Sequence, residues 1–254
     1  MLPFLKPIIT RRQPCFFMSP HFDDAILSAA GLMRFLVKSG VPVTVVNIFT
    51  RSGDAASQTL SAKKYLLSTG FSDPAKLYAT RRQEDSLVLN KLGVNVINLE
   101  FTEALWRRKP LSAVGHLAGQ LIPELAHIYP VYRWHITRGR VSPLDSLTSQ
   151  KLARQLKKII PGKAVVFCPW GFGNHVDHLL TRQVCDRLFR PVYWLDQPYY
   201  FRHRQPALPT PYPPQKFPVN PRFKKQAISL YKSQVTRLFK NGKIPLLEET
   251  YLPS

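Results

Sequence analysis

The stretch that decides the fold lies near the start of the chain and reads CFFMSPHFDDAILSAAGLMRFLVKSGVPVTVVNIF (residues 15–49). It opens with an apolar run, residues 15–18, of the kind that forms a buried strand. Apolar residues then recur at helical spacing over 25–37, and a second apolar run, rich in β-branched side chains, covers 43–49. Strand, helix and strand within about 35 residues form a βαβ unit, which implies parallel strands and a right-handed crossover.

The remaining sequence continues this alternation. Apolar runs predict strands at residues 94–99, 131–136, 164–168 and 192–195. Helical periodicity predicts helices at residues 80–92, 111–127, 147–160, 177–189 and 222–239. Residues 50–74 are expected to form a loop with some helix, the proline-rich residues 206–221 an extended surface loop or lid, and the tail around 246–247 to pack back. We therefore predict an α/β fold: a single Rossmann-like, doubly wound domain over residues 1–254, with a mostly parallel sheet and a core at about residues 14–235.

The chain is strongly basic, since 36 Lys and Arg against 15 Asp and Glu give a net charge of +21. Such a surface attracts nucleic acids, anionic membranes and acidic glycans alike, and it says nothing about the fold. A generally basic surface without a specific partner is the alternative interpretation. The basic clusters at residues 107–109 and 222–225 are accordingly expected to be solvated.

The cysteines and the N-terminal stretch give an expectation for the cellular compartment. The three cysteines, Cys15, Cys168 and Cys185, are too few and too scattered for a disulfide framework, so we expect apolar core residues in a reducing compartment. The N-terminal stretch lacks the continuous apolar segment of a secretory signal, and no apolar run is long enough to span a membrane. We therefore expect a cytoplasmic protein without a transmembrane span.

Two polar clusters follow predicted strands: SPHFDD at residues 19–24 and GNHVDH at residues 173–178. In open parallel sheets, ligands bind beyond the carboxyl ends of strands, so two such clusters can meet in space. Imidazole and carboxylate groups suit a divalent metal such as zinc, and a neighbouring carboxylate can accept a proton from the attacking water. Each cluster alone could be a helix cap or a helix-face pair; together they favour a metal site.

The motifs resemble those of a known family. The sequence His21-Phe22-Asp23-Asp24 resembles the His-Pro-Asp-Asp motif of the LmbE-like, or PIG-L, N-acetylglucosaminyl deacetylases, and residues 175–178 match that family's His-x-Asp-His motif. Weaker similarities occur in the expected order at residues 50–53, 81–94, 193–199 and 225–234. Two positions depart from the family: Phe22 replaces a common proline, and Ala25 stands where an acidic residue is common.

The resemblance implies an LmbE-like deacetylase fold and a hydrolase that uses zinc or another divalent metal. Such an enzyme removes an N-acetyl or other small acyl group from an N-acetylglucosamine-type sugar or glycoconjugate. The metal ligands implied by the motifs are His21, Asp24 and His178.

The resemblance also implies roles for the neighbouring residues. Asp23 is the expected general base, and His175 is expected to stabilise the tetrahedral intermediate as an acid or electrostatically. Asp177 is expected to orient a neighbouring histidine, and Arg81 to hold sugar hydroxyls. The Trp side chains at 106, 134, 170 and 194 could stack on sugar faces or lie in the core.

Two other functions remain open from the residues alone. A metal-dependent phosphoesterase also uses His and Asp ligands and would gain from a basic surface. A non-enzymatic nucleic-acid-binding protein would explain the charge but needs no metal; the sequence carries no recognisable nucleic-acid signature, so this partner is not expected. Because a net charge of +21 exceeds what a neutral sugar requires, the substrate or its carrier is expected to be anionic.

Overall fold

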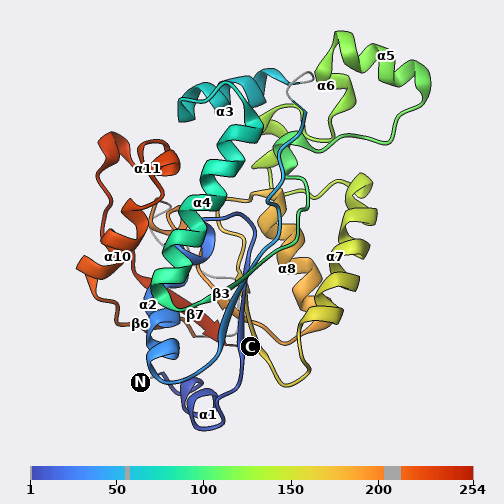
Figure 1. The fold of residues 1–254 in the computed structure, drawn as a ribbon. Helices are drawn as coiled ribbons and strands as arrows, with labels where there is room; N and C mark the ends of the chain where they lie inside the picture. Colours follow the sequence, from blue (N-terminus) through green and yellow to red (C-terminus); the bar gives the residue numbers. More distant parts are fainter. Residues whose placement is uncertain (1, 55–57, 203–212, 254) are drawn as a thin grey trace.

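The structure, a computed structural model, describes residues 2–54, 58–202 and 213–253 (Figure 1). Its sheet has the strand order β3-β2-β1-β4-β5-β7-β6. The first five strands run parallel, whereas β7 pairs antiparallel with both β5 and β6. The strand bounds are β1 (Cys15–Ser19), β2 (Val43–Asn47), β3 (Asn95–Asn98), β4 (Val165–Pro169), β5 (Val192–Trp194), β6 (Gln215–Phe217) and β7 (Glu249–Pro253).

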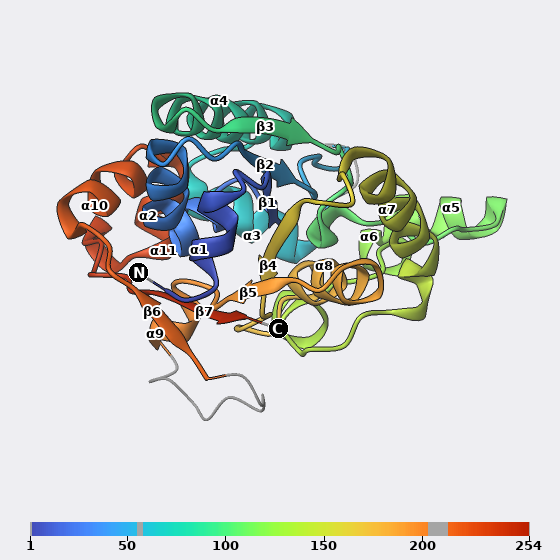
Figure 2. The same ribbon diagram turned by 90° about the horizontal axis from the view of Figure 1, so that it is seen from below.

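Helices cover both faces of this sheet. Figure 2 shows α2 and α10 on one side and α7 and α8 on the other. The predicted doubly wound α/β fold with a mostly parallel sheet is thereby confirmed. The helix bounds are α1 (Leu5–Thr10), α2 (Asp24–Lys38), α3 (Leu60–Thr69), α4 (Pro74–Leu92), α5 (Ala113–Leu121), α6 (Pro123–Ala126), α7 (Ser146–Ile159), α8 (Val176–Leu188), α9 (Tyr199–Arg202), α10 (Pro221–Ser229) and α11 (Lys232–Leu238).

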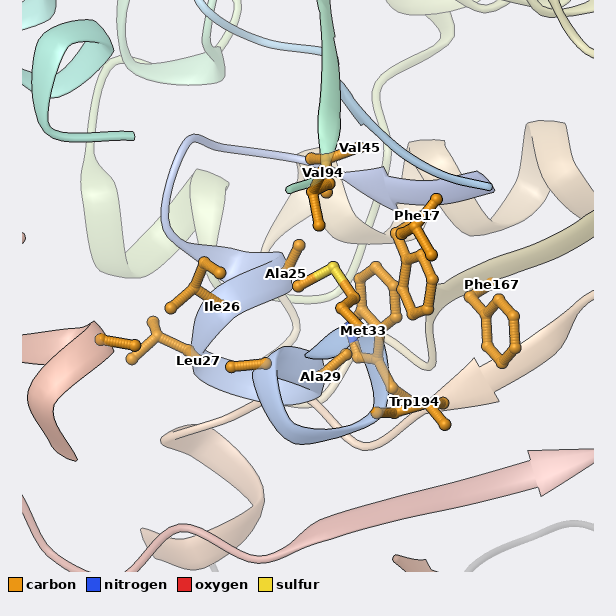
Figure 3. Packing of buried hydrophobic residues seen from close by; sticks show 14 of the residues in the cluster. Phe17, Ala25, Ile26, Leu27, Ala29, Met33, Val45, Val94, Phe167 and Trp194 are labelled. Carbon is orange, nitrogen blue, oxygen red and sulfur yellow. The ribbon is translucent and has the colours of Figure 1, made fainter. Parts of the chain in front are cut away.

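The core follows from the alternation of side chains along each strand. Phe17, Phe167 and Trp194 point to one face, where they pack against α2 (Figure 3). The neighbouring residues Met18 and Cys168 point to the other face, under α7 and α8. Phe17 stacks on Phe167 with the ring centroids 4.4 Å apart, which ties β1 to β4. All three cysteines are buried and unpaired, as the sequence predicted.

The first strand and helix are joined by a tightly bonded loop. The hydroxyl of Ser19 donates to the carbonyl of His21 at 2.5 Å and accepts from the amide of Ala25 at 3.1 Å. These bonds connect the end of β1 to the first turn of α2, because one side chain satisfies groups on both sides of the turn. The loop at residues 19–24 is therefore held in one shape before any ligand binds.

Several sequence predictions need correction. Residues 131–136 do not form a strand: Tyr132–Ile136 is a single π-helical turn, η2, and short apolar runs do not distinguish helix from strand. Pro123 begins α6 and ends the predicted helix 111–127 early, and the predicted helix 222–239 is divided into α10 and α11. Of the proline-rich segment 206–221, residues 206–212 lie outside the described residues, and residues 215–217 form β6 rather than a loop.

The tail packs back as an inserted strand and brings a buried charge with it. Glu249 of β7 is fully buried and accepts hydrogen bonds from the amides of Gly31 and Leu32 in α2, at 2.7 and 3.0 Å. The ammonium group of Lys224 lies 2.9 Å from the same carboxylate. The expectation that residues 222–225 are solvated is thus wrong for Lys224, which is 2% exposed. A buried lysine requires a partner of opposite charge, and Glu249 supplies it.

No helix in the described part of the chain combines the length and the apolar character that crossing a membrane requires.

Candidate active site

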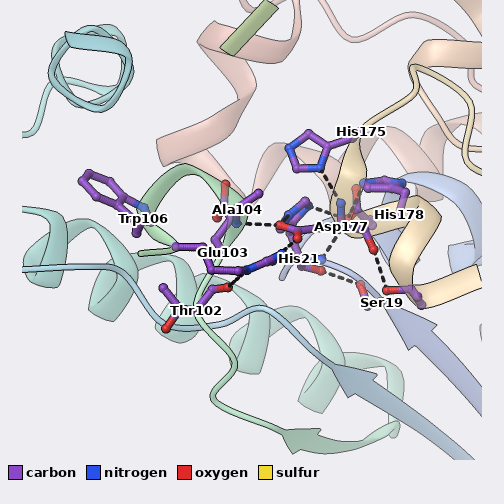
Figure 4. A network of polar contacts seen from close by, with 12 residues as sticks. Ser19, His21, Thr102, Glu103, Ala104, Trp106, His175, Asp177 and His178 are labelled. Atoms are coloured by element: carbon purple, nitrogen blue, oxygen red, sulfur yellow. Dashed lines mark hydrogen bonds and ion pairs between the residues drawn. The ribbon is translucent and has the colours of Figure 1, made fainter. Parts of the chain in front are cut away.

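The two polar clusters meet at the carboxyl ends of β1 and β4. These strands are neighbours in the sheet, but their chain connections lead in opposite directions, to β2 on one side and β5 on the other. Such a switch point leaves a crevice in an open parallel sheet. His21 reaches it from the loop after β1, and His175 and His178 from the start of α8 (Figure 4). Asp24 reaches it as the first residue of α2.

Three side chains converge with the spacing of metal ligands. In the trio His21, Asp24 and His178, one potential ligand atom from each residue lies within 4.8 Å of the others, and all three are buried. Nδ1 of His21 lies 3.0 Å, and Nε2 of His178 3.2 Å, from Oδ2 of Asp24. Two ligands of a tetrahedral zinc lie about 3.4 Å apart, so this trio fits a small divalent cation.

The outer nitrogen of each histidine is bound by a carboxylate. Nε2 of His21 lies 3.2 Å from Asp177, and Nδ1 of His178 lies 2.6 Å from Asp196. Nε2 of His178 is buried and makes no hydrogen bond within the described residues, but it lies in ion-pair range of Asp24, 3.2 Å from Oδ2. A histidine that binds metal through one nitrogen usually donates the other N–H to a carboxylate, and His178 has this arrangement.

The pKa shifts of His21 and Asp24 also indicate a cation site at this trio. Burial lowers the pKa of His21, but Glu103 and Asp24 outweigh burial and raise this pKa to about 9. Burial raises the pKa of Asp24, yet the two nearby imidazoles hold it well below its usual range. The site thus places positive charge beside a carboxylate, and a bound cation would replace protons on these rings.

A second trio, His21, His175 and Asp177, has comparable distances. The oxygens of Asp177 are already occupied: Oδ2 accepts from the amide of Ala104 at 2.9 Å, and Oδ1 accepts from Arg107 (Figure 4). Arg107 therefore lowers the pKa of Asp177, although burial alone would raise it. These bonds suit an orienting carboxylate better than a metal ligand.

Asp23 lies beside the trio and is held by Arg81. It occupies the N-cap position of α2, but its side chain makes no capping hydrogen bond, so capping does not explain it. Its Oδ1 lies 3.2 Å from Arg81, whose guanidinium is also 3.3 Å from Glu103. Burial raises the pKa of Asp23, and Arg81 opposes this shift. A carboxyl with a raised pKa is a better proton acceptor at neutral pH than an exposed aspartate.

His175 is fixed in one tautomer by the backbone. Its Nδ1 accepts a hydrogen bond from the amide of Asp177 at 3.2 Å at the N-terminus of α8. Burial, with the positive charge of His21 nearby, lowers its pKa well below the usual value. The ring is therefore neutral, and its proton is on Nε2.

These groups line a narrow cavity of about 30 Å³, which we call the inner pocket. It holds roughly two water molecules, so only a small group can enter it. Its wall includes His21, Asp23, Asp24, Arg81, Glu103 and His175, together with Tyr65, Tyr132, Tyr199 and Arg237. Of the seven residues singled out from the sequence, Asp177 and His178 lie behind this wall and the other five line it.

Sequence reasoning missed three charged residues of the site. Asp196 was seen only as part of the stretch 193–199, and Glu103 was not singled out. Arg107 was expected to be solvated, but it is 6% exposed and paired with Asp145 and Asp177. Arg107 lies 70 residues before Asp177, a pairing that leaves no signal in the sequence. Asp196, in contrast, lies two residues after β5, a position that indicates the same edge of the sheet.

Known structures with a similar fold include several deacetylases. The zinc-inhibited form of teicoplanin deacetylase Orf2 aligns with a TM-score of 0.70 at 20% identity, over 94% of this chain and 97% of that chain. The A40926 pseudoaglycone deacetylase Dbv21 aligns with a TM-score of 0.67 at 21% identity, over 95% and 97%. The conserved protein TT1542 from Thermus thermophilus aligns with a TM-score of 0.52 at 14% identity, over 94% of both chains. No curated protein matches the sequence.

The family is identified by its sequence model. The model for PIG-L, described as GlcNAc-PI de-N-acetylase, matches residues 16–189, a range that holds both motif clusters and more than half of the chain. The resemblance predicted from the motifs is confirmed, and the N-deacetylase class prevails over the phosphoesterase alternative. The chain therefore belongs to the PIG-L family of metal-dependent N-deacetylases.

Proposed function

We propose that this protein binds one zinc ion through His21, Asp24 and His178 and removes an acetyl or other small acyl group from an amino-sugar conjugate. The observation that carries the proposal is His178, whose Nδ1 is bound to Asp196 while its buried Nε2 faces Oδ2 of Asp24 at 3.2 Å. A ring so oriented beside Asp24 and His21 is prepared for a cation.

The bound ion would lower the pKa of a water molecule and polarise the acyl oxygen. Asp23 accepts the proton of that water, because its carboxylate lines the pocket and its pKa is raised by burial. Arg81 holds Oδ1 of Asp23 and so fixes the direction in which the carboxylate faces. When the bond between carbon and nitrogen breaks, Asp23 returns this proton to the leaving amine.

His175 stabilises the negative charge that develops on the acyl oxygen. Its neutral ring carries the proton on Nε2, since Nδ1 is occupied by the backbone amide of Asp177. A fixed donor in a water-poor pocket stabilises such charge without having to reorganise. Asp177 and Asp196 orient His21 and His178, and Arg107 keeps Asp177 ionised.

The size of the inner pocket limits which part of the substrate reacts there. A cavity of about 30 Å³ admits an acyl group but not a sugar ring. The sugar then lies at the mouth, and Arg81, which lines the pocket and holds Asp23, is the candidate for contact with a hydroxyl that reaches inward. We further infer an anionic substrate from the net charge of +21, and action in the cytoplasm from the three free thiols.

The proposal is tested by metal analysis together with mass spectrometry. Purified protein is expected to contain about one equivalent of zinc, which a chelator removes and added zinc restores. A panel of N-acetylglucosamine conjugates incubated with the metal-loaded protein is expected to lose the mass of one acetyl group, with release of acetate. Zinc at stoichiometry without acetate release from any conjugate would contradict the proposed reaction but not the site.

A further inference from the structure

A second, wider pocket opens beside the inner pocket. This outer pocket has a volume of about 380 Å³ and lies between α3, the turn η2 and α11. Tyr65, Tyr132 and Arg237 belong to the walls of both pockets. A substrate whose acyl group enters the inner pocket therefore has its remaining part directed toward the outer one.

The lining of the outer pocket is cationic. It contains Lys64, Arg133 and Arg237 and no carboxylate. None of these three cations lies within 4 Å of a carboxylate in the described part of the chain. In the inner pocket, by contrast, Arg81 is paired with two carboxylates.

Unpaired cations alone are weak support for an anion-binding site. The chain has 36 Lys and Arg residues against 15 Asp and Glu, so many cations lack an acidic partner in any case. The position of Arg237 adds the second observation. Its guanidinium lies 4.5 Å from the centre of the Tyr65 ring, and the residue is half-buried at the junction of the two pockets. A half-buried guanidinium with no carboxylate within 4 Å is costly, and an incoming anion would reduce that cost.

We propose that the outer pocket binds an anionic group, a phosphate or a carboxylate, on the part of the substrate beyond the reacting amino sugar. This inference rests on the proposed function, because it assumes that the acyl group is in the inner pocket. Lys64 and Arg133 bind the anion from the wall of the outer pocket, and Arg237 adds positive charge at the junction. Trp134, which is 66% exposed in the same wall, offers a flat apolar face to whatever links the sugar to the anion.

The test compares matched substrates on matched variants. The substrates are N-acetylglucosamine 1-phosphate, the 4-carboxyphenyl glycoside of N-acetylglucosamine, and the neutral 4-methylphenyl and methyl glycosides. The outer-pocket variant is Lys64→Gln/Arg133→Gln, which leaves the inner pocket intact because neither residue lines it. The control is Lys63→Gln/Lys232→Gln, which removes two exposed cations from α3 and α11 outside the pocket.

We expect the wild-type protein to prefer an anionic substrate over its neutral counterpart. The outer-pocket variant should lose at least about 10-fold in kcat/KM for that anionic substrate, as expected when hydrogen bonds to a charged group are removed. It should change by less than about 2-fold for the neutral glycosides, and the control should change neither. Loss with the phosphate alone, or with the carboxylate alone, identifies the anion.

Binding is measured separately by calorimetric titration with N-acetylglucosamine 1-phosphate and the methyl glycoside. Weaker binding of N-acetylglucosamine 1-phosphate to the outer-pocket variant, with the control unchanged, supports the inference. This holds even if no glycoside is deacetylated; in that case only the proposed reaction is wrong. Equal binding and equal kcat/KM in the wild type, the variant and the control would overturn it. Equal losses for anionic and neutral substrates would also overturn it, since the two cations would then act on the pocket's structure.

Discussion

The inner and outer pockets share a wall, but they differ in how their charged groups are paired. In the inner pocket, Arg81 and the two histidines that face Asp24 each have carboxylate partners, so orientation is fixed before substrate arrives. In the outer pocket, three cations converge without any carboxylate in the lining. Charge that is oriented in advance serves the chemical step, whereas cations without a carboxylate partner within 4 Å serve recognition of the substrate.

Removal of His178 should produce the largest effect, because it takes away a proposed ligand from the rigid pocket. His178→Ala is expected to lose the metal and to lower turnover by roughly 10³-fold or more, while the fold persists. Metal content by mass spectrometry and far-ultraviolet circular dichroism check both statements. The control His135→Ala changes an exposed histidine of η2 and should retain full metal. Full occupancy in His178→Ala would exclude this residue as a ligand.

Asp23→Asn should separate metal binding from proton transfer. The amide can still accept the hydrogen bond from Arg81 but cannot take a proton from water. We expect metal content near that of the wild type and a fall in kcat of about 10²–10⁴-fold, the range for loss of a general base. If the metal is lost together with activity, Asp23 belongs among the ligands and the proposed base is wrong.

Asp196→Asn should have a smaller effect, because Asp196 acts through His178. The change weakens the orientation of the imidazole, and metal affinity is expected to fall by about 10–100-fold. Competition with a chromogenic zinc chelator measures this affinity. At saturating zinc the variant should regain most of its turnover, a recovery that a general structural role for Asp196 would not produce.

The protonation of Asp85 is expected to change the stability of the fold with pH rather than the activity. Burial raises its pKa to about 7, although hydrogen bonds from Tyr231 and Asn47 oppose the shift. The folded protein therefore binds this proton more tightly than the unfolded chain, so the stabilising contribution is complete below about pH 4 and declines as pH rises toward 7. Urea unfolding between pH 5 and 8 should show a stability that falls by about 1–3 kcal/mol more in the wild type than in Asp85→Asn. Parallel curves would place the pKa of Asp85 near its ordinary value.

The sequence was sufficient for the parallel half of the fold and for the place of the site. Continuous apolar runs identified β1, β2, β4 and β5, and the clusters after β1 and β4 predicted where the candidate ligand side chains meet. The partners of those clusters were less accessible. Asp196 and Arg107 act through pairings between residues far apart in the chain, which local patterns do not encode.

The antiparallel edge was missed for a different reason. The strands β6 and β7 are short, and Lys216 and Glu249 interrupt any apolar run. A charged residue such as Glu249 fits in a buried strand only because a residue from another element, here Lys224, pairs with it. The organisation as a single domain, the identity of the metal and the contact of Arg81 with sugar hydroxyls stay predictions.

The insertion of β7 between β5 and β6 sets an order for biosynthesis. The edge of the sheet is completed by residues 249–253, and Glu249 also binds the middle of α2, the helix whose first turn carries Asp24. Before residues 249–253 have been made, both motif clusters are present, yet β5 has an open edge and Lys224 lacks its partner Glu249. The nascent chain therefore has an unpaired strand edge until residues 249–253 have emerged, and this interval is when chaperone binding matters most.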